Sequence, residues 1–129
     1  MKLDSIQNDN RGEILLLTGL SNYPECTVFK TKRGYARGGC VHNINDEFVV
    51  VIEGSIEYFC YTPRGMSRTS MYSGDRIKVI HGTPHYFISH TDSVVLEWGA
   101  TPSEKQHKHE DFRKIVDEHN SKQLASEML

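Results

Sequence analysis

The chain has 129 residues, of which 37% are hydrophobic and 25% are charged. This length supports one hydrophobic core, so we expect a single domain spanning residues 1–129. The net charge of -2 and the pI near 6.4 give no broad basic field, which argues against nucleic acid or an anionic membrane as a partner. We expect a cytoplasmic protein, because no apolar run approaches the roughly eighteen residues of a membrane span and the N-terminus lacks a signal-peptide core.

After a polar start, apolar runs of strand length recur along the chain with turn residues between them, which predicts an all-β fold. Strict alternation over residues 55–61 predicts a half-exposed strand, whereas residues 49–52 are apolar on both faces and predict a buried one. Gly54, between these two runs, suits a tight hairpin. The expected strands cover residues 13–17, 26–30, 47–53, 55–61, 76–80, 85–89 and 93–98.

The pattern changes after the last of these strands. A Thr-Pro-Ser-Glu segment starting at Thr101 has the order of a helix N-terminus, namely a cap, a proline and an acid three residues after the cap. It predicts a helix over about residues 102–120, with residues 121–129 as a frayed tail. The helix can dock only by a narrow apolar stripe, formed by Phe112, Ile115 and Val116. Three histidines on this segment are expected to be solvated: His107, His109 and His119.

Side chains of metal-ligand type stand at fixed offsets near the middle of the chain. Cys40 and His42 are two residues apart on an expected strand, so they point to the same face. Glu47 begins the next apolar run and joins them if residues 43–46 turn the chain back. A buried carboxylate needs a partner, which favours a ligand or ion-pair role for Glu47. Imidazole and carboxylate around an open coordination position suit Fe, Mn, Ni or Zn.

The spacing of this segment resembles the first motif of the cupin superfamily, G-x5-H-x-H-x4-E-x6-G. Gly34, His42, Glu47 and Gly54 match the motif, and Cys40 replaces its first histidine. A thiolate at this position would complete a four-ligand set and favour Zn or Fe over Mn. A packed residue in the barrel wall is the alternative reading of Cys40.

About thirty residues later, a second segment resembles the second cupin motif, G-x5-P-x-G-x2-H-x3-N. Gly74, Gly82 and His85 match, while Ile80 and Ser89 replace the proline and the asparagine of the motif. The two motifs in this order imply a cupin-type antiparallel β-barrel, or jelly roll, with a short C-terminal helix.

The resemblance also implies a barrel over about residues 9–99 and a bound divalent metal as cofactor. In the family, the positions of His42, Glu47 and His85 hold the metal, and Cys40 is the candidate fourth ligand.

A second, weaker resemblance points to the 3,4-ketoisomerases and 3,5-epimerases of sugar-nucleotide biosynthesis. Asp9-x-Arg11-Gly before the first expected strand and Arg37-Gly before His42 are similar to motifs of those families. The similarity implies proton transfer next to a carbonyl of a keto sugar, with His42 or His85 as the base. It also implies that Arg37 and Arg11 contact the substrate. Cys40 and Glu47 depart from the residues of those families.

Tyr58 and Tyr86 are further candidates for contact with the substrate, although packing inside a barrel is the commoner role of such tyrosines. The favoured function is an isomerase or epimerase acting on a sugar, a nucleotide sugar or a similar hydroxy-carbonyl metabolite. A metal-dependent oxidoreductase of dioxygenase type and a non-catalytic module that binds a small ligand are the alternatives, because a fold alone does not decide among them. We also expect a homodimer formed through barrel edges, with residues 48–52 and Phe87 as apolar edge segments.

Overall fold

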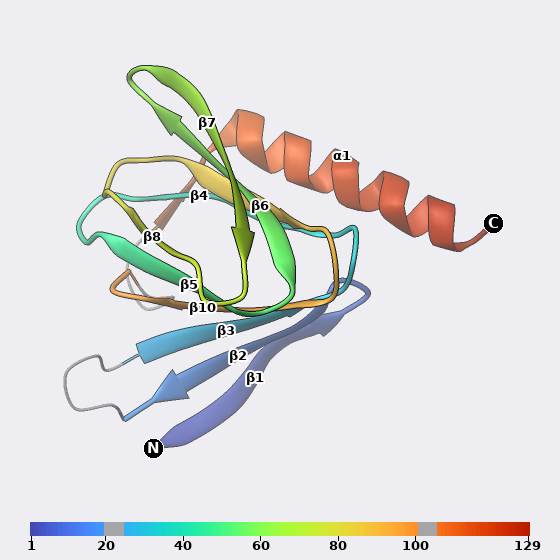
Figure 1. The fold of residues 1–129 in the computed structure, drawn as a ribbon, viewed down its shortest axis with the longest axis horizontal. Coiled ribbons are helices and arrows are strands. Elements are labelled where there is room, and N and C mark those ends of the chain that lie inside the picture. The colour runs from blue at the N-terminus through green and yellow to red at the C-terminus, as the bar shows by residue number, and fades with distance from the viewer. Residues whose placement is uncertain (20–24, 101–105) are drawn as a thin grey trace.

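The structure, a computed structural model, describes residues 1–19, 25–100 and 106–129. Two antiparallel β-sheets face each other and a single C-terminal helix lies against one of them (Figure 1). This arrangement confirms the predicted all-β jelly roll. No helix among the described residues has the length and apolar character needed to cross a membrane.

The two sheets have six and five strands. The six-stranded sheet contains, in spatial order, β1 (Lys2–Asp9), β2 (Gly12–Thr18), β3 (Glu25–Thr31), β10 (Ser93–Trp98), β5 (Glu47–Glu53) and β8 (Arg76–Val79). The five-stranded sheet contains β11 (Gln106–Lys108), β4 (Ala36–His42), β9 (His85–Ser89), β6 (Ser55–Thr62) and β7 (Gly65–Tyr72).

Every strand expected from the apolar runs is present, but two long strands, β1 and β7, were not predicted. Both pair with one neighbour and most of their side chains are exposed, so their sequences carry little hydrophobic alternation. Their pairing comes from tight connections instead, between Asp9 and Gly12 and between Thr62 and Gly65. The sheet region therefore begins at Lys2, earlier than the predicted residue 9.

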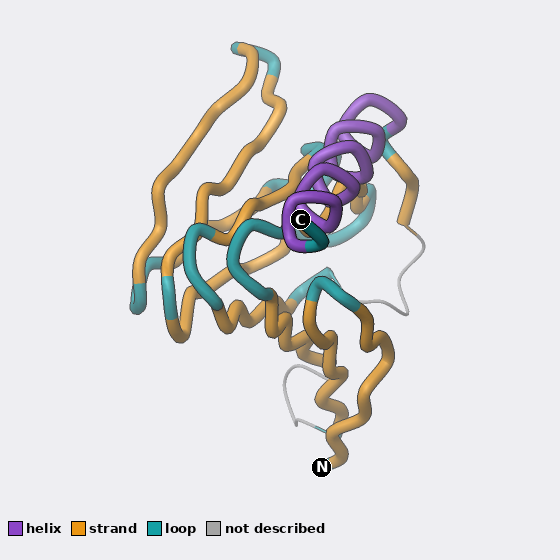
Figure 2. Tube along the Cα trace, turned by 90° about the vertical axis from the view of Figure 1, so that its right-hand side faces the viewer, coloured by secondary structure: helices purple, strands orange, loops and turns teal. Residues whose placement is uncertain are grey.

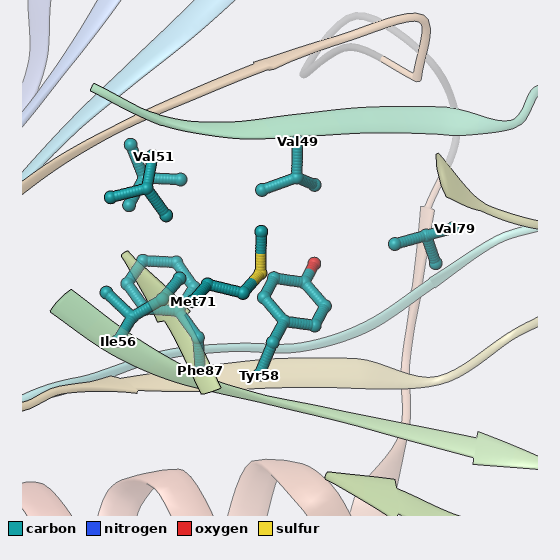
Figure 3. Packing of buried hydrophobic residues seen from close by; sticks show 8 residues of the cluster. Val49, Val51, Ile56, Tyr58, Met71, Val79 and Phe87 are labelled. Atoms are coloured by element: carbon teal, nitrogen blue, oxygen red, sulfur yellow. The ribbon is translucent and has the colours of Figure 1, made fainter. Parts of the chain in front are cut away.

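The hydrophobic core fills the space between the two sheets (Figure 3). Alternate residues of the central strands point into it, as their period of two requires. The buried cluster consists of Val49, Val51, Ile56, Tyr58, Met71, Val79, Phe87 and Val95. Burial of each aliphatic side chain contributes about 1.5–3 kcal/mol. Because Phe87 is inside this core and β5 lies between β10 and β8, neither forms the barrel edge that we expected for a dimer.

The C-terminal helix α1 (Glu110–Glu127) starts later and ends later than predicted. Thr101 and the three residues after it lie outside the described residues, and residues 106–108 form β11, which pairs with β4. His109 caps the helix instead, because its Nδ1 atom accepts a hydrogen bond from the Phe112 N–H at 3.3 Å. The Tyr35 hydroxyl donates a hydrogen bond to the Glu127 carboxylate at 2.6 Å, which ties the last turn of the helix to the sheet domain.

Helix α1 covers the outer face of the five-stranded sheet, as the two views in Figures 1 and 2 agree. Phe112 and Val116 pack on Ala36 and Tyr86, and the Asn120 amide pairs with the backbone N–H and C=O of Ala36 at 2.7 and 3.0 Å. Two residues of the expected apolar stripe, Phe112 and Val116, therefore form the docking face, whereas Ile115 is 41% exposed. The expectation of solvated histidines is wrong for two of the three: His109 is the cap, and His119 donates from Nε2 to the carbonyl of Gly34 at 2.6 Å.

Two glycines let the helix and strand β9 approach β4 closely. Gly38 and Gly39 have φ angles of 112° and 91°, and the register between β4 and β9 shifts between Gly38 and Cys40. A Cβ atom on Gly39 would lie 2.9 Å from the Arg113 Cα atom on the helix. The bulge leaves Cys40 and His42 on the inward face of β4, where both line the internal cavity.

Candidate metal centre

Three ligand-type side chains meet inside the barrel: His42 at the end of β4, Glu47 at the start of β5 and His85 at the start of β9. One ligand atom from each lies within 4.8 Å of the others. All three residues are buried, with exposed fractions of 7%, 3% and 6%. The structure thus brings together three of the four predicted metal ligands.

The carboxylate of Glu47 lies between the two imidazoles. Its Oε2 atom is 3.3 Å from His42 Nε2, and its Oε1 atom is 3.0 Å from His85 Nε2. Among the described residues, Oε1 has no hydrogen-bond partner with suitable geometry. This buried carboxylate oxygen faces a ring nitrogen, but the two atoms are not aligned for a hydrogen bond. A cation bound between them would explain the arrangement.

His85 is oriented by its second ring nitrogen. Nδ1 lies 2.9 Å from the carbonyl oxygen of Thr83, which can only accept a hydrogen bond, so Nδ1 carries the hydrogen and Nε2 faces Glu47. Burial acts to lower the pKa of His85, but the Glu47 carboxylate and the Thr83 carbonyl outweigh it and raise the pKa above its ordinary value. Metal-binding histidines in proteins commonly have this outer-shell carbonyl contact. The residues present therefore fit a divalent metal.

The His42, Glu47 and His85 side chains border a cavity of about 280 Å³. A buried cation, Arg37, lines the same cavity. Its Nε atom donates to Thr31 Oγ1 at 3.2 Å, whereas its Nη1 atom is buried and has no hydrogen-bond partner within the described part of the chain. Burial, together with Arg11, lowers the pKa of Arg37 to about 10, so the group remains charged at neutral pH. A buried guanidinium with an unused donor is suited to an anionic ligand.

Arg11 lines the same cavity, but it is already paired. Its guanidinium makes three hydrogen bonds to the Asp9 carboxylate, the shortest at 2.6 Å, and these hold the pKa of Asp9 at about 2. Of the two predicted substrate-binding arginines, Arg37 is the one with an unused donor, while Arg11 is held at the cavity wall.

No protein-family model matches the sequence, and no curated protein matches it. Solved structures do match. The capsular polysaccharide assembling protein CapF from Staphylococcus aureus superposes on 84% of this chain with a TM-score of 0.71 and 15% identity. The oxalate decarboxylase of Lactobacillus farciminis, in a formate complex, superposes on 82% with a TM-score of 0.69 and 13% identity.

KdgF from Halomonas sp. is similar over 78% of this chain and 88% of its own, with a TM-score of 0.63 and 17% identity. All three neighbours are cupin-fold proteins. This chain has the cupin fold. It spans only about a third of the CapF and oxalate decarboxylase chains, 32% and 33% respectively.

Cys40 lies on the inward face of this cupin barrel, as predicted, and borders the cavity. Its sulfur is nevertheless not one of the atoms of the three-residue group. Burial raises the pKa of the Cys40 thiol, although Arg113 acts in the opposite direction, so the thiol form is favoured at neutral pH. A role for Cys40 as fourth ligand stays a prediction.

The two predicted tyrosines have different surroundings. Tyr58 lies in the cavity wall, where its ring is stacked at 6.1 Å on that of His85 and its buried hydroxyl has no hydrogen-bond partner among the residues described. Tyr86 borders the cavity too, but its ring packs under the helix, 4.6 Å from Phe59 and 5.0 Å from Phe112. The structure thus directs Tyr58, rather than the ring of Tyr86, toward the cavity.

Besides Arg113 on α1, sequence reasoning missed a second titratable residue of the cavity, Glu97 on β10. It is 8% exposed and points inward between its strand partners Thr27 and Val49. Burial raises the pKa of Glu97 well above its usual range, and the nearby Glu47 raises it further. A signal was available in the sequence, because Glu97 occupies the same alternating face as Val95 in an otherwise apolar strand.

Proposed function

We propose that this protein is a metal-dependent isomerase or epimerase of a small hydroxy-carbonyl metabolite that carries an anionic group. The observation that carries the proposal is that the His42, Glu47 and His85 group and the unused Nη1 donor of Arg37 border one cavity. A metal next to a fixed cation suits a substrate with a carbonyl or hydroxyl oxygen at one end and a carboxylate or phosphate at the other.

The size of the cavity favours a small substrate. Its volume of about 280 Å³ is at the low end for small-molecule sites, which commonly measure about 300–1,000 Å³. A sugar or a hydroxy acid suits such a space, whereas the nucleotide part of a nucleotide sugar would lie outside it. The similarity in fold to an oxalate decarboxylase, solved in a formate complex, supports a small carboxylate as the anionic group.

In the proposed reaction, the side chains of the cavity have different chemical roles. When bound, a divalent ion held by His42, Glu47 and His85 would polarise a carbonyl and make the neighbouring carbon more acidic. Arg37 holds the anionic end of the substrate. Glu97 retains a proton because burial and Glu47 raise its pKa, so it can donate that proton to the carbonyl oxygen of the substrate. The carboxylate that this leaves can then accept the proton from the neighbouring carbon, which restores the protonated Glu97.

Metal binding would remove both histidines as candidates for the base. An imidazole that gives its Nε2 lone pair to a metal cannot also remove a proton, so His42 and His85 act as ligands when the ion is bound. The expectation that one of them is the base applies to a metal-free centre. Burial raises the pKa of the Tyr58 phenol well above its usual range, so this hydroxyl is protonated at neutral pH and can only donate.

Deuterium exchange from solvent into a panel of hydroxy acids, oxo acids and keto sugars tests the proposal by NMR. We expect exchange that needs added divalent metal, falls at least about a hundredfold in His85→Ala, and is unchanged in His81→Ala. His81 is exposed and hydrogen-bonded to Asp46, so it is a matched control outside the cavity. Absence of exchange across the panel, with metal bound, would rule out an isomerase of this type.

A metal-dependent oxidoreductase is the second candidate, because two histidines and one carboxylate are the ligands of many non-haem Fe(II) oxygenases. Oxygen consumption by the Fe(II)-loaded protein with the same panel separates the two functions. Consumption of oxygen without deuterium exchange would favour the oxidoreductase. Saturable binding with neither reaction would favour the ligand-binding module.

A further inference from the structure

Helix α1 contributes one residue, Arg113, to the wall of the cavity. The helix lies on the outer face of the five-stranded sheet, so strand β4 separates it from the barrel interior (Figures 1 and 2). Strand β4 has no side chains at this point, because Gly38 and Gly39 follow one another where the strand bulges. The Arg113 side chain therefore lines the same cavity as the metal-ligand group.

The two glycines hold the Arg113 side chain close to β4. Its Nη1 atom donates a hydrogen bond to the carbonyl oxygen of Gly38 at 2.8 Å. A Cβ atom on Gly39 would lie only 3.3 Å from the Arg113 Cδ atom, so a larger residue would displace the side chain. The Arg113 Nη2 atom lies 3.5 Å from Asp117, whose side chain is 61% exposed. Such an exposed ion pair is weak, and the two contacts use only part of the five N–H donors of a guanidinium.

The positive charge of Arg113 acts on the interior of the cavity. Burial raises the pKa of the Cys40 thiol, and Arg113 is the main influence that lowers it. Because Cys40 borders the cavity, an anionic group of a ligand beside it is attracted by the same charge. Arg113 is thus both a part of the cavity wall and a source of positive potential within it.

The arginines of the cavity differ in how far carboxylates of the chain neutralise them. Arg11 is paired with Asp9. Arg37 contacts a hydroxyl and a carbonyl oxygen, and no carboxylate within the described part of the chain binds it directly. The carboxylate near Arg113 lies outside the cavity in water. A ligand with one anionic group can neutralise Arg37 or Arg113, whereas a ligand with two can neutralise both, which reduces the cost of burying these charges.

We propose that Arg113 determines specificity and that the substrate is a hydroxy or oxo acid with two carboxylates. This inference rests on the proposed function, because it assigns a second anionic group to the same substrate. Arg37 binds one carboxylate, and Arg113 binds the other at the part of the wall formed by Gly38. A cavity of about 280 Å³ is small enough for one short dicarboxylate to contact both arginines.

Calorimetric titration of the full chain with malate and with 2-hydroxybutyrate tests the proposal. The two hydroxy acids have the same carbon chain, but a methyl group of 2-hydroxybutyrate replaces the second carboxylate of malate. We expect the wild type to bind malate at least about tenfold more tightly. Arg113→Met, which keeps an unbranched side chain beside Gly39, should remove most of this preference and leave the affinity for 2-hydroxybutyrate unchanged. Lys114→Met is the matched control, because it removes an equal charge from an exposed position on the same helix.

The ratio of the two affinities separates specificity from a structural role. If Arg113 only supported the bulge at Gly38, its loss would weaken the binding of both acids equally, and an unchanged ratio overturns the proposal. Absence of a preference for malate in the wild type, or of saturable malate binding, also overturns it. Arg113→Lys keeps the charge and should retain part of the preference.

The outcome of this titration is independent of the proposed reaction. A preference for malate that depends on Arg113 supports the inference even if the protein catalyses no deuterium exchange. Deuterium exchange without a preference for malate would support the proposed function and contradict the inference.

Discussion

The Nδ1 atom of His85 lies 2.9 Å from the carbonyl oxygen of Thr83, and this contact decides how the ring meets Glu47. Because Nδ1 must carry the hydrogen, Nε2 is left to face the Glu47 carboxylate at 3.0 Å. Such a ring is either a doubly protonated partner of Glu47 or a metal ligand with a fixed tautomer. Metal binding should therefore depend on this imidazole more than on any exposed histidine.

Replacing His85 with alanine should abolish metal binding. The group offers only three strong ligands among the described residues, so loss of one leaves too few to retain the ion during purification. Elemental analysis of untagged protein should show the ion in the wild-type protein and its loss in His85→Ala and His42→Ala, with a reduced amount in Glu47→Gln. His107→Ala serves as the control, and equal loss in that variant would place the ion on the C-terminal segment.

Cys40→Ser should retain the metal. The Cys40 sulfur borders the cavity but does not belong to the three-residue group, and burial raises the pKa of its thiol. For the same reason we expect slow alkylation of Cys40 in the folded protein. Burial also raises the pKa values of Cys26 and Cys60 to about 11, so all three thiols should react mainly after denaturation. Loss of the metal in Cys40→Ser, or rapid alkylation that added metal prevents, would make Cys40 a fourth ligand.

The sequence predicted those parts of the fold and site that leave a local pattern. The apolar runs predicted the strands, and the spacing of His42 and Glu47 predicted that they converge. His85 joined them through the resemblance to the second cupin motif. The start of the helix was not predictable in this way. The segment at Thr101 has the composition of a cap, but residues 106–108 pair with β4, and this tertiary pairing overrides local preference.

Features of the site that depend on contacts between residues distant in sequence could not be predicted. The pairing of Arg11 with Asp9 could have been expected, since they are two positions apart, but we expected Arg11 to contact the substrate. The unused Nη1 donor of Arg37 depends on what surrounds it in space, as does the proximity of Glu97 to Glu47. No local sequence pattern specifies which distant residues surround a given side chain.

Arg37→Met should weaken the binding of small anions. The guanidinium is charged at neutral pH, since its pKa of about 10 is well above 7, and it presents an unused donor to the cavity. Because methionine cannot make the charge-assisted hydrogen bonds that arginine makes to a carboxylate, the affinity should fall by about ten- to a hundredfold. Calorimetric titration of the metal-loaded protein with oxalate measures it, and the exposed Arg76→Met is the control. Similar affinities in wild type and Arg37→Met would exclude Arg37 as the anion site.

Glu57→Gln should lose stability at neutral pH but not in strong acid. On the outer side of β6, Glu57 contacts His90, Arg68 and Ser70, which together hold its pKa at about 2 against an ordinary value of 4.5. A carboxyl whose pKa is lowered by folding stabilises the protein above its unfolded pKa and loses this effect as the pH falls toward 2. Urea unfolding at pH 7 and pH 3 should therefore give a wild-type advantage that shrinks with acid. A difference independent of pH would mean that packing, not charge, determines the effect.

Glu97→Gln should change stability with the opposite dependence on pH. Burial and the nearby Glu47 raise the pKa of Glu97, so the folded state binds its proton more tightly than the unfolded state does. The free energy of unfolding of the wild type therefore falls as the pH rises above about 4.5, whereas glutamine, which has a similar shape, cannot ionise and removes this decline. Urea unfolding of chelator-treated protein at pH 5 and pH 8 should show a gain for Glu97→Gln that grows with pH.

The Glu97→Gln variant should also lose deuterium exchange while keeping its metal, because it has no proton to transfer. Wild-type exchange in a stably folded Glu97→Gln protein would remove Glu97 from the mechanism and return the proton to another group of the cavity.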